Sequence, residues 1–94
     1  MRKKILIIED EIDLIKVLKD TFEKENFQVF CAENGEEGVE KFYEKNPDLI
    51  LLDINMPKKN GWEVCKEVRE QSNIPIVMMT ARDSEIDELK GLNI

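Results

Sequence analysis

Three short apolar runs, each followed by polar residues, constrain the fold of this 94-residue chain more than any other feature. The runs cover residues 5–8, 49–52 and 76–79. Uninterrupted apolar runs of this length are typical of strands that are buried on both faces of a parallel sheet. The polar residues that end them are Glu9, Asp10, Asp53 and Thr80. In parallel α/β sheets, ligands bind just beyond the carboxyl ends of the strands, so these residues are candidates for a functional site.

Strand and helix patterns alternate four times along the chain. The expected strands cover residues 4–9, 27–32, 48–53 and 75–80, and the expected helices cover residues 11–25, 35–45, 61–71 and 84–92. Repeated strand–helix units predict a parallel sheet with right-handed crossovers and with helices on both faces. We therefore expect the α/β class, with residues 1–94 forming a single domain.

Each expected helix has a start signal. The residues just before the helices are Asp10, Asn34, Asn60 and Ser84. The last three are each followed, three positions later, by an acidic residue, in the pattern of a capping box. Gly61 is expected to serve the turn into the third helix, because glycine tolerates unusual backbone conformations.

Composition excludes several classes of function. The net charge of −7 argues against a direct nucleic-acid partner, because the phosphate backbone would repel the chain. No apolar stretch approaches the roughly 18 residues of a membrane span, and no signal-peptide pattern is present, so we expect a cytoplasmic protein.

Cys31 and Cys65 are expected to be buried or half-buried core residues. With two cysteines and no histidine, a zinc site is not expected.

The acidic residues at the strand ends admit ordinary interpretations as well as a functional one. Asp53 by itself can start a turn, and Asp10 can cap a helix. If the first and third strands are neighbours, however, Glu9, Asp10 and Asp53 converge. Crowding them would raise at least one pKa and destabilise the fold unless a cation were bound. Mg²⁺ fits such a set of hard oxygen ligands.

These motifs resemble those of the receiver domain of bacterial two-component response regulators. The matching segments are residues 7–11, 48–57, Gly61 and residues 79–81. The resemblance extends over the whole chain with the same order and spacing, and the motifs together are highly specific. It implies a flavodoxin-like, doubly wound parallel sheet with strand order 2-1-3-4 for the four units present.

In that family, the aspartate that matches Asp53 accepts a phosphoryl group from a histidine of a partner sensor kinase. The resemblance implies that Glu9, Asp10 and Asp53 hold Mg²⁺, together with the backbone carbonyl of Asn55. The absence of histidine is no objection, because the donor histidine belongs to the kinase.

The resemblance also assigns roles to the end of the fourth strand. Thr80 is expected to donate its hydroxyl to the phosphoryl group and to take part in switching, with the small Ala81 beside it. The implied function is phosphorelay signalling through a switched interaction surface. Such a domain is a regulator, with at most Mg²⁺-dependent self-phosphorylation and autodephosphorylation. A longer parent protein would carry an output domain.

The sequence departs from the family pattern at its C-terminal end. The fourth strand is continuously apolar, which is typical of a central strand, and the family's fifth-strand lysine and switch aromatic have no counterpart before Ile94. We therefore expect a receiver domain that lacks its fifth strand and helix. Self-association through the open sheet edge, as in domain swapping, is then expected as well.

Of three alternative functions, the sequence argues against two and leaves the third open. A haloacid-dehalogenase-like phosphatase needs a second acid and a threonine or valine where this chain has Asn55 and Pro57. A flavodoxin-like flavin carrier needs a phosphate-binding loop after the first strand, where Glu9, Asp10 and Glu11 would repel a phosphate. The third alternative is a receiver-like scaffold that keeps the acidic residues but does not switch.

Overall fold

The computed structural model describes residues 2–54 and 60–79, which form four strands and three helices. In chain order the elements are β1 (Lys4–Ile8), α1 (Ile12–Lys24), β2 (Gln28–Ala32), α2 (Gly35–Lys45), β3 (Leu49–Asp53), α3 (Gly61–Gln71) and β4 (Ile76–Met79). The bounds of α2 and α3 match the sequence prediction, and each end of the other described elements matches it or differs from it by one residue. The helix expected at 84–92 lies outside the described residues.

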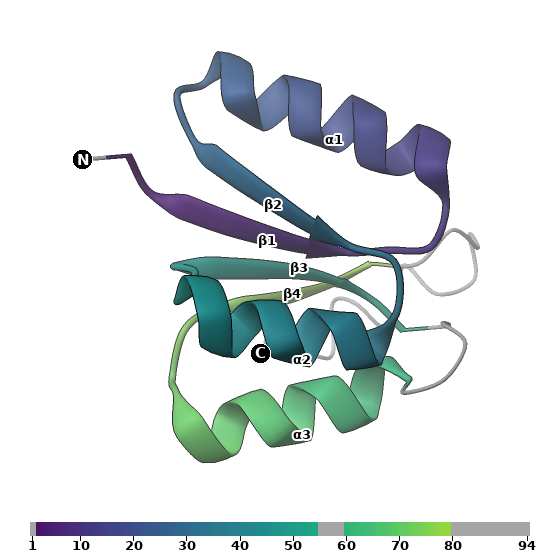
Figure 1. Cartoon of the computed structure of the whole chain (residues 1–94), viewed down its shortest axis with the longest axis vertical. Coiled ribbons are helices and arrows are strands. Elements are labelled where there is room, and N and C mark those ends of the chain that lie inside the picture. Colours follow the sequence, from purple (N-terminus) through teal and green to yellow (C-terminus); the bar gives the residue numbers. More distant parts are fainter. Residues whose placement is uncertain (1, 55–59, 80–94) are drawn as a thin grey trace.

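The strands form one parallel sheet in the order β2-β1-β3-β4, which confirms the predicted topology. Lys4 pairs with Gln28 at one side of β1, and Ile8 pairs with Leu52 at the other. Figure 1 shows α1 on one face of the sheet and α2 with α3 on the opposite face. This is the doubly wound arrangement that repeated right-handed strand–helix units produce.

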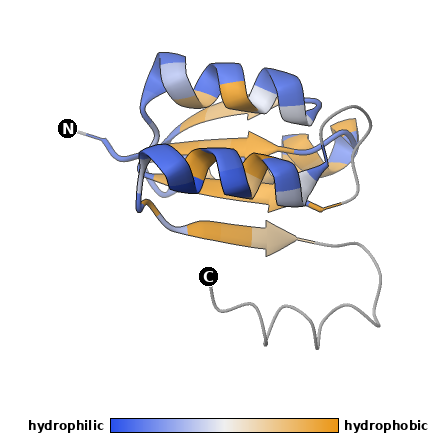
Figure 2. Ribbon diagram, turned by 90° about the horizontal axis from the view of Figure 1, so that it is seen from below, coloured by the Kyte–Doolittle hydropathy of each residue, from blue (hydrophilic) through white to orange (hydrophobic). Residues whose placement is uncertain are grey.

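The alternation of side chains along the strands divides the core between the two faces of the sheet. Even-numbered residues of β1 and β3 pack against α2 and α3, in a cluster that includes Leu6, Ile50 and Val64. Odd-numbered residues pack on the α1 face, in a cluster that includes Ile7 and Leu51. Figure 2 shows apolar residues concentrated on the strands. Burial on both faces explains why these strands are continuously apolar.

Side chains cap two of the three described helices. At α3 the predicted capping box is complete, because Asn60 accepts from the Glu63 N–H and Glu63 accepts from the Asn60 N–H. At α2, Asn34 accepts from the Glu37 N–H at 2.9 Å, but the Glu37 carboxylate accepts from Glu33 instead. The box predicted at α2 is therefore only half formed.

Two further expectations concern cysteines and membranes. Cys31 and Cys65 are free and half-buried, as predicted. None of the helices formed by residues 2–54 and 60–79 has the length and apolar character that crossing a membrane requires.

The core on the α2–α3 face can be tested with two valine substitutions. Val64 is fully buried on α3, whereas Val17 on α1 is 61% exposed. Val64→Ala should lower the free energy of unfolding by about 1.5–3 kcal/mol, because it removes buried apolar surface. Val17→Ala should change it by less than about 0.5 kcal/mol. Urea unfolding of both variants checks this, and equal losses would contradict the assigned core.

Candidate metal centre

The pairing of β1 with β3 brings two acidic residues together. Ile8 is the last residue of β1 and pairs with Leu52. The next residues along the two strands are Glu9 and Asp53, and both point to the α1 side because side chains alternate along a strand. A backbone hydrogen bond from Glu9 N to Ala32 O keeps the chain in register one residue beyond β1. The register of the sheet therefore positions these two carboxylates.

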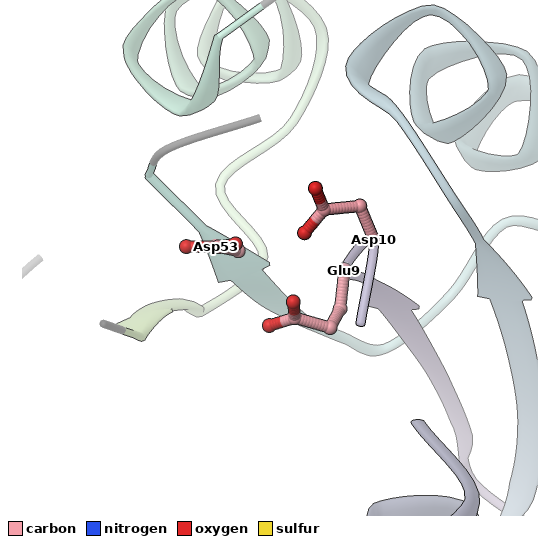
Figure 3. Close-up of side chains that lie close together, drawn as sticks. All are labelled: Glu9, Asp10 and Asp53. Atoms are coloured by element: carbon pink, nitrogen blue, oxygen red, sulfur yellow. The ribbon is translucent and has the colours of Figure 1, made fainter. Parts of the chain in front are cut away.

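Asp10 completes a cluster of three acidic side chains. One carboxylate oxygen from each of Glu9, Asp10 and Asp53 lies within 4.8 Å of the others. Figure 3 shows the three side chains gathered beyond the ends of β1 and β3. Glu9 is 4% exposed and Asp53 is 9% exposed, whereas Asp10 is exposed to solvent. The site is therefore buried where Glu9 and Asp53 line it, and it is accessible to solvent where Asp10 lines it.

The buried carboxyl of Glu9 is perturbed by its surroundings. The pKa of Glu9 is raised from an ordinary value of 4.5 to about 7, chiefly by burial and to a smaller extent by the nearby charges of Asp53 and Asp10. The N–H of Glu11 donates to Glu9 Oε2 at 3.0 Å and opposes this shift. The sequence predicted a raised pKa from crowding of like charges. The structure confirms the direction, but desolvation is the larger cause.

The expectation that Asp10 caps the first helix was wrong. The residue in the N-cap position of α1 is Glu11, and no side chain makes a capping hydrogen bond there. Asp10 stands one residue earlier, in the acidic cluster. The helix-start pattern failed because an aspartate beside a helix start can serve either a cap or a neighbouring site.

The side chains of the acidic cluster fit the ligand set of a divalent metal ion. Its donors are carboxylate oxygens, which suit hard divalent cations such as Mg²⁺. The raised pKa of Glu9 indicates that the folded chain disfavours the ionised form of this carboxyl, chiefly because it is buried and also because Asp53 and Asp10 lie close to it. A bound divalent cation removes that conflict, because it favours the ionised form of each ligand.

Other residues of the predicted site cannot be placed in the same way. Asn55, Thr80 and Ala81 lie outside the described residues. The nearest described neighbour of Thr80 along the chain is Met79, which pairs with Asp53. The pairing brings the ends of β3 and β4 to the same edge of the sheet.

The sequence interpretation missed the contact that Gly61 makes near the acidic cluster. Gly61 begins α3 and its N–H donates to Ile54 O, which agrees with the expected role in the turn into that helix. No glycine in the described ranges has a positive φ, however, so an unusual backbone conformation is not what requires a glycine here. Gly61 is instead buried at the start of α3, against the backbone of Asp53 and Ile54. A glycine at a first helical position is too weak a sequence signal to reveal such a contact.

The raised pKa of Glu9 predicts that the metal-free protein loses stability as the pH rises. In the unfolded chain Glu9 ionises near 4.5, whereas in the folded chain it keeps its proton up to about pH 7. Between these values the folded state binds more protons, so raising the pH favours unfolding. The loss from this group is on the order of 3 kcal/mol and is complete above pH 7. Urea unfolding in chelator at pH 5 and pH 8 measures it.

Glu9→Gln is the variant that tests this assignment, because it has no carboxyl to ionise. Its free energy of unfolding should depend less on pH than that of the unchanged chain over the same interval. The neighbouring Glu11→Gln is the matched control and should keep the original dependence. An unaltered pH dependence in Glu9→Gln would show that another group causes the loss.

Comparison with known proteins relates this site to one family. The family model described as "Response regulator receiver domain" matches residues 5–94. The BeF₃-activated N-terminal receiver domain of Klebsiella pneumoniae RstA is similar, with a TM-score of 0.86 and 31% identity over 96% of this chain and 77% of that one.

Two other solved structures are similar to the same extent. Vibrio cholerae chemotaxis protein CheY4 has a TM-score of 0.85 and 30% identity, over 98% of this chain and 79% of its own. Response regulator TrrA from Thermotoga maritima, in complex with Mg²⁺-BeF, has a TM-score of 0.83 and 36% identity, over 97% and 80%. The matched family model and these similarities establish that the chain belongs to the response regulator receiver domain family.

Proposed function

We propose that this receiver domain acts in a phosphorelay and that Asp53 accepts the phosphoryl group from a partner histidine kinase. The observation that carries the proposal is the position of Asp53 at the end of β3, with Glu9 and Asp10 within 4.8 Å. Of the three acidic residues only Asp53 lies on β3, where it pairs with Met79 at the end of β4. The similar response regulator TrrA was solved in complex with Mg²⁺-BeF, which supports the proposal of a Mg²⁺ site in this domain.

The proposed transfer is a substitution at phosphorus. A carboxylate oxygen of Asp53 attacks the phosphorus atom of a phosphohistidine and forms an acyl phosphate. The P–N bond breaks, its electron pair stays on the histidine nitrogen, and that nitrogen takes up a proton. The protein's task is to place the carboxylate in line with the bond that breaks and to offset negative charge.

Glu9, Asp10 and Asp53 would hold Mg²⁺, with the backbone carbonyl of Asn55 as a further ligand. When bound, Mg²⁺ supplies positive charge that offsets the negative charge on the transferred oxygens. These three carboxylates lie together at the ends of β1 and β3 (Figure 3). Burial of Glu9 and Asp53 reduces screening by water and so strengthens the electrostatic attraction between the ion and its ligands.

We further propose that Thr80 donates its hydroxyl to the phosphoryl group, with Ala81 leaving room beside it. In this proposal Thr80 follows Met79, the partner of Asp53 across the β3–β4 pair. Phosphorylation adds negative charge and acceptor oxygens, which such a hydroxyl can bind. Movement of Thr80 would then bias the surface that a partner recognises.

The proposed role is therefore regulatory, with residues 1–94 acting as one receiver domain. Its partners would be a sensor kinase and, in a longer parent, an output domain. Self-association through β4, which is the last strand at one side of the sheet formed by the described residues, is a separate proposal. Val77 on this strand is 48% exposed, so apolar surface is available next to that edge. Light scattering tests it, and a monodisperse monomer would exclude it.

Substitution of the acceptor tests the proposed phosphorylation. Asp53→Asn should abolish the phosphoryl adduct that phosphoramidate produces in the presence of Mg²⁺, because the amide is not a nucleophile of this kind. Asp48→Asn is the matched control, since Asp48 is exposed just before the other end of β3 and should leave the adduct unchanged. Intact-mass spectrometry measures the adduct. Equal phosphorylation of Asp53→Asn would refute the assignment.

The metal site can be tested separately by calorimetric titration with Mg²⁺. Glu9→Gln should weaken Mg²⁺ binding by roughly 10- to 100-fold, because it removes one carboxylate from the cluster. Glu11→Gln changes the net charge by the same amount but lies outside the cluster, and should bind Mg²⁺ almost as well as the unchanged chain. Equal affinities of the two variants would contradict a site at Glu9.

The alternative of a silent scaffold makes a different prediction in the same experiments. A chain that folds but forms no adduct with phosphoramidate and Mg²⁺ would keep the receiver fold without its chemistry. The acidic cluster favours phosphorylation over this alternative, because burying Glu9 and Asp53 together is unfavourable and serves no packing purpose.

A further inference from the structure

Gly61, at the start of α3, lies against the backbone of the acceptor strand. A methyl carbon built on Gly61 would lie 2.6 Å from Ile54 Cα and 2.8 Å from the carbonyl oxygen of Asp53. Separations below 3.0 Å are essentially never seen for real side chains, and both atoms belong to the backbone. Any side chain at position 61 must therefore displace either α3 or the Asp53–Ile54 peptide.

Two backbone hydrogen bonds hold Ile54, the residue that follows Asp53, in place. The Gly61 N–H donates to Ile54 O at 3.0 Å, which ties the start of α3 to the end of β3. The Ile54 N–H donates to Met79 O at 3.3 Å, which ties the same residue to β4. The residue that follows Asp53 is thereby fixed between a helix and a neighbouring strand.

The start of α3 is itself well fixed. Asn60 and Glu63 form a complete capping box, and Val64, one turn into the helix, is fully buried. A helix end that is capped and anchored in this way does not yield easily to a clash. The strand end that carries Asp53 would therefore take up part of the displacement caused by a side chain at position 61.

We propose that Gly61 is a positioning residue for Asp53: its missing side chain lets the start of α3 hold the Asp53–Ile54 peptide where the Asp53 carboxylate meets Glu9 and Asp10. This inference deepens the proposed function and rests on it for the phosphorylation rate. Its consequence for metal binding is independent of phosphorylation. Gly61 touches no reacting group, so its effect passes through the position of Asp53.

Gly38 provides a matched control for Gly61. It lies near the start of α2, and a methyl carbon there would lie 2.5 Å from Cδ1 of Ile8. The clash is as close as that at Gly61, but it involves a side chain that can change rotamer. Ile8 packs in the core on the α2–α3 face, whereas the acidic side chains lie on the other side of the sheet. Gly38→Ala should therefore affect stability more than the acidic site.

The experiment compares Gly61→Ala with Gly38→Ala by three measurements. Urea unfolding gives stability, calorimetry gives Mg²⁺ affinity, and intact-mass spectrometry gives the rate of phosphorylation by phosphoramidate at saturating Mg²⁺. We expect Gly61→Ala to lower both the affinity and the rate at saturating Mg²⁺ by about tenfold or more, since misplacement of a reacting group by about 1 Å costs on that order. Gly38→Ala should keep both within about threefold at a similar or larger loss of stability.

A second pair of variants decides the matter if Gly61→Ala does not fold. Asn60→Ala removes the cap of α3, and Asn34→Ala removes the equivalent cap of α2. Each should cost about 1 kcal/mol of stability. Only Asn60→Ala should weaken Mg²⁺ binding and slow phosphorylation, because only α3 holds the Asp53–Ile54 peptide.

The outcomes separate this inference from the proposed function. Normal Mg²⁺ affinity and rate in folded Gly61→Ala, or equal losses in Gly61→Ala and Gly38→Ala, would overturn the positioning role while the proposed function stands. An unchanged chain that binds Mg²⁺ but forms no adduct would overturn the proposed function, and the Mg²⁺ titrations would still decide the role of Gly61. An unchanged chain that binds no Mg²⁺ would overturn both.

Discussion

The parallel pairing of β1 with β3 is the constraint on which the rest of the structure depends. The pair Ile8–Leu52 places Glu9 next to Asp53, and the alternation of side chains turns both toward the α1 face. A shift of one residue in this register would send one carboxylate to the opposite face and bury it among apolar side chains. The register that completes the core therefore also assembles the acidic cluster.

In this arrangement, the burial of carboxylates that the proposed function needs lowers the stability of the fold. Leu6, Ile50 and Leu52 are fully buried and favour the observed sheet, whereas the adjacent Glu9 must lose most of its hydration. The raised pKa of Glu9 records this cost in the metal-free chain. A divalent cation would relieve it, so ligand binding and folding are expected to be thermodynamically linked at this site.

Much of the fold could be predicted from the sequence, because its signals are local and repeated. Continuous apolar runs gave the strands, and the Asn60–Glu63 pair located the start of α3 to the residue. The convergence of Glu9 with Asp53 followed from topology, since strand ends of a parallel sheet share an edge. Asp10 was harder to assign, because an aspartate before a helix fits a cap and a metal site equally well. Only the three-dimensional contacts of Glu11 and Asp10 separate these interpretations.

Gly61 illustrates a kind of information that the sequence does not carry. A glycine at a helix start suggests backbone freedom, yet its φ is ordinary and the reason for it lies in a different element. The need for a missing side chain arises only when α3 is docked against the end of β3, and docking depends on the whole sheet. Local sequence patterns therefore do not reveal a residue whose role is to let two backbone segments approach closely. In this receiver domain such a residue connects the helix that packs on one face to the carboxylate that faces the other.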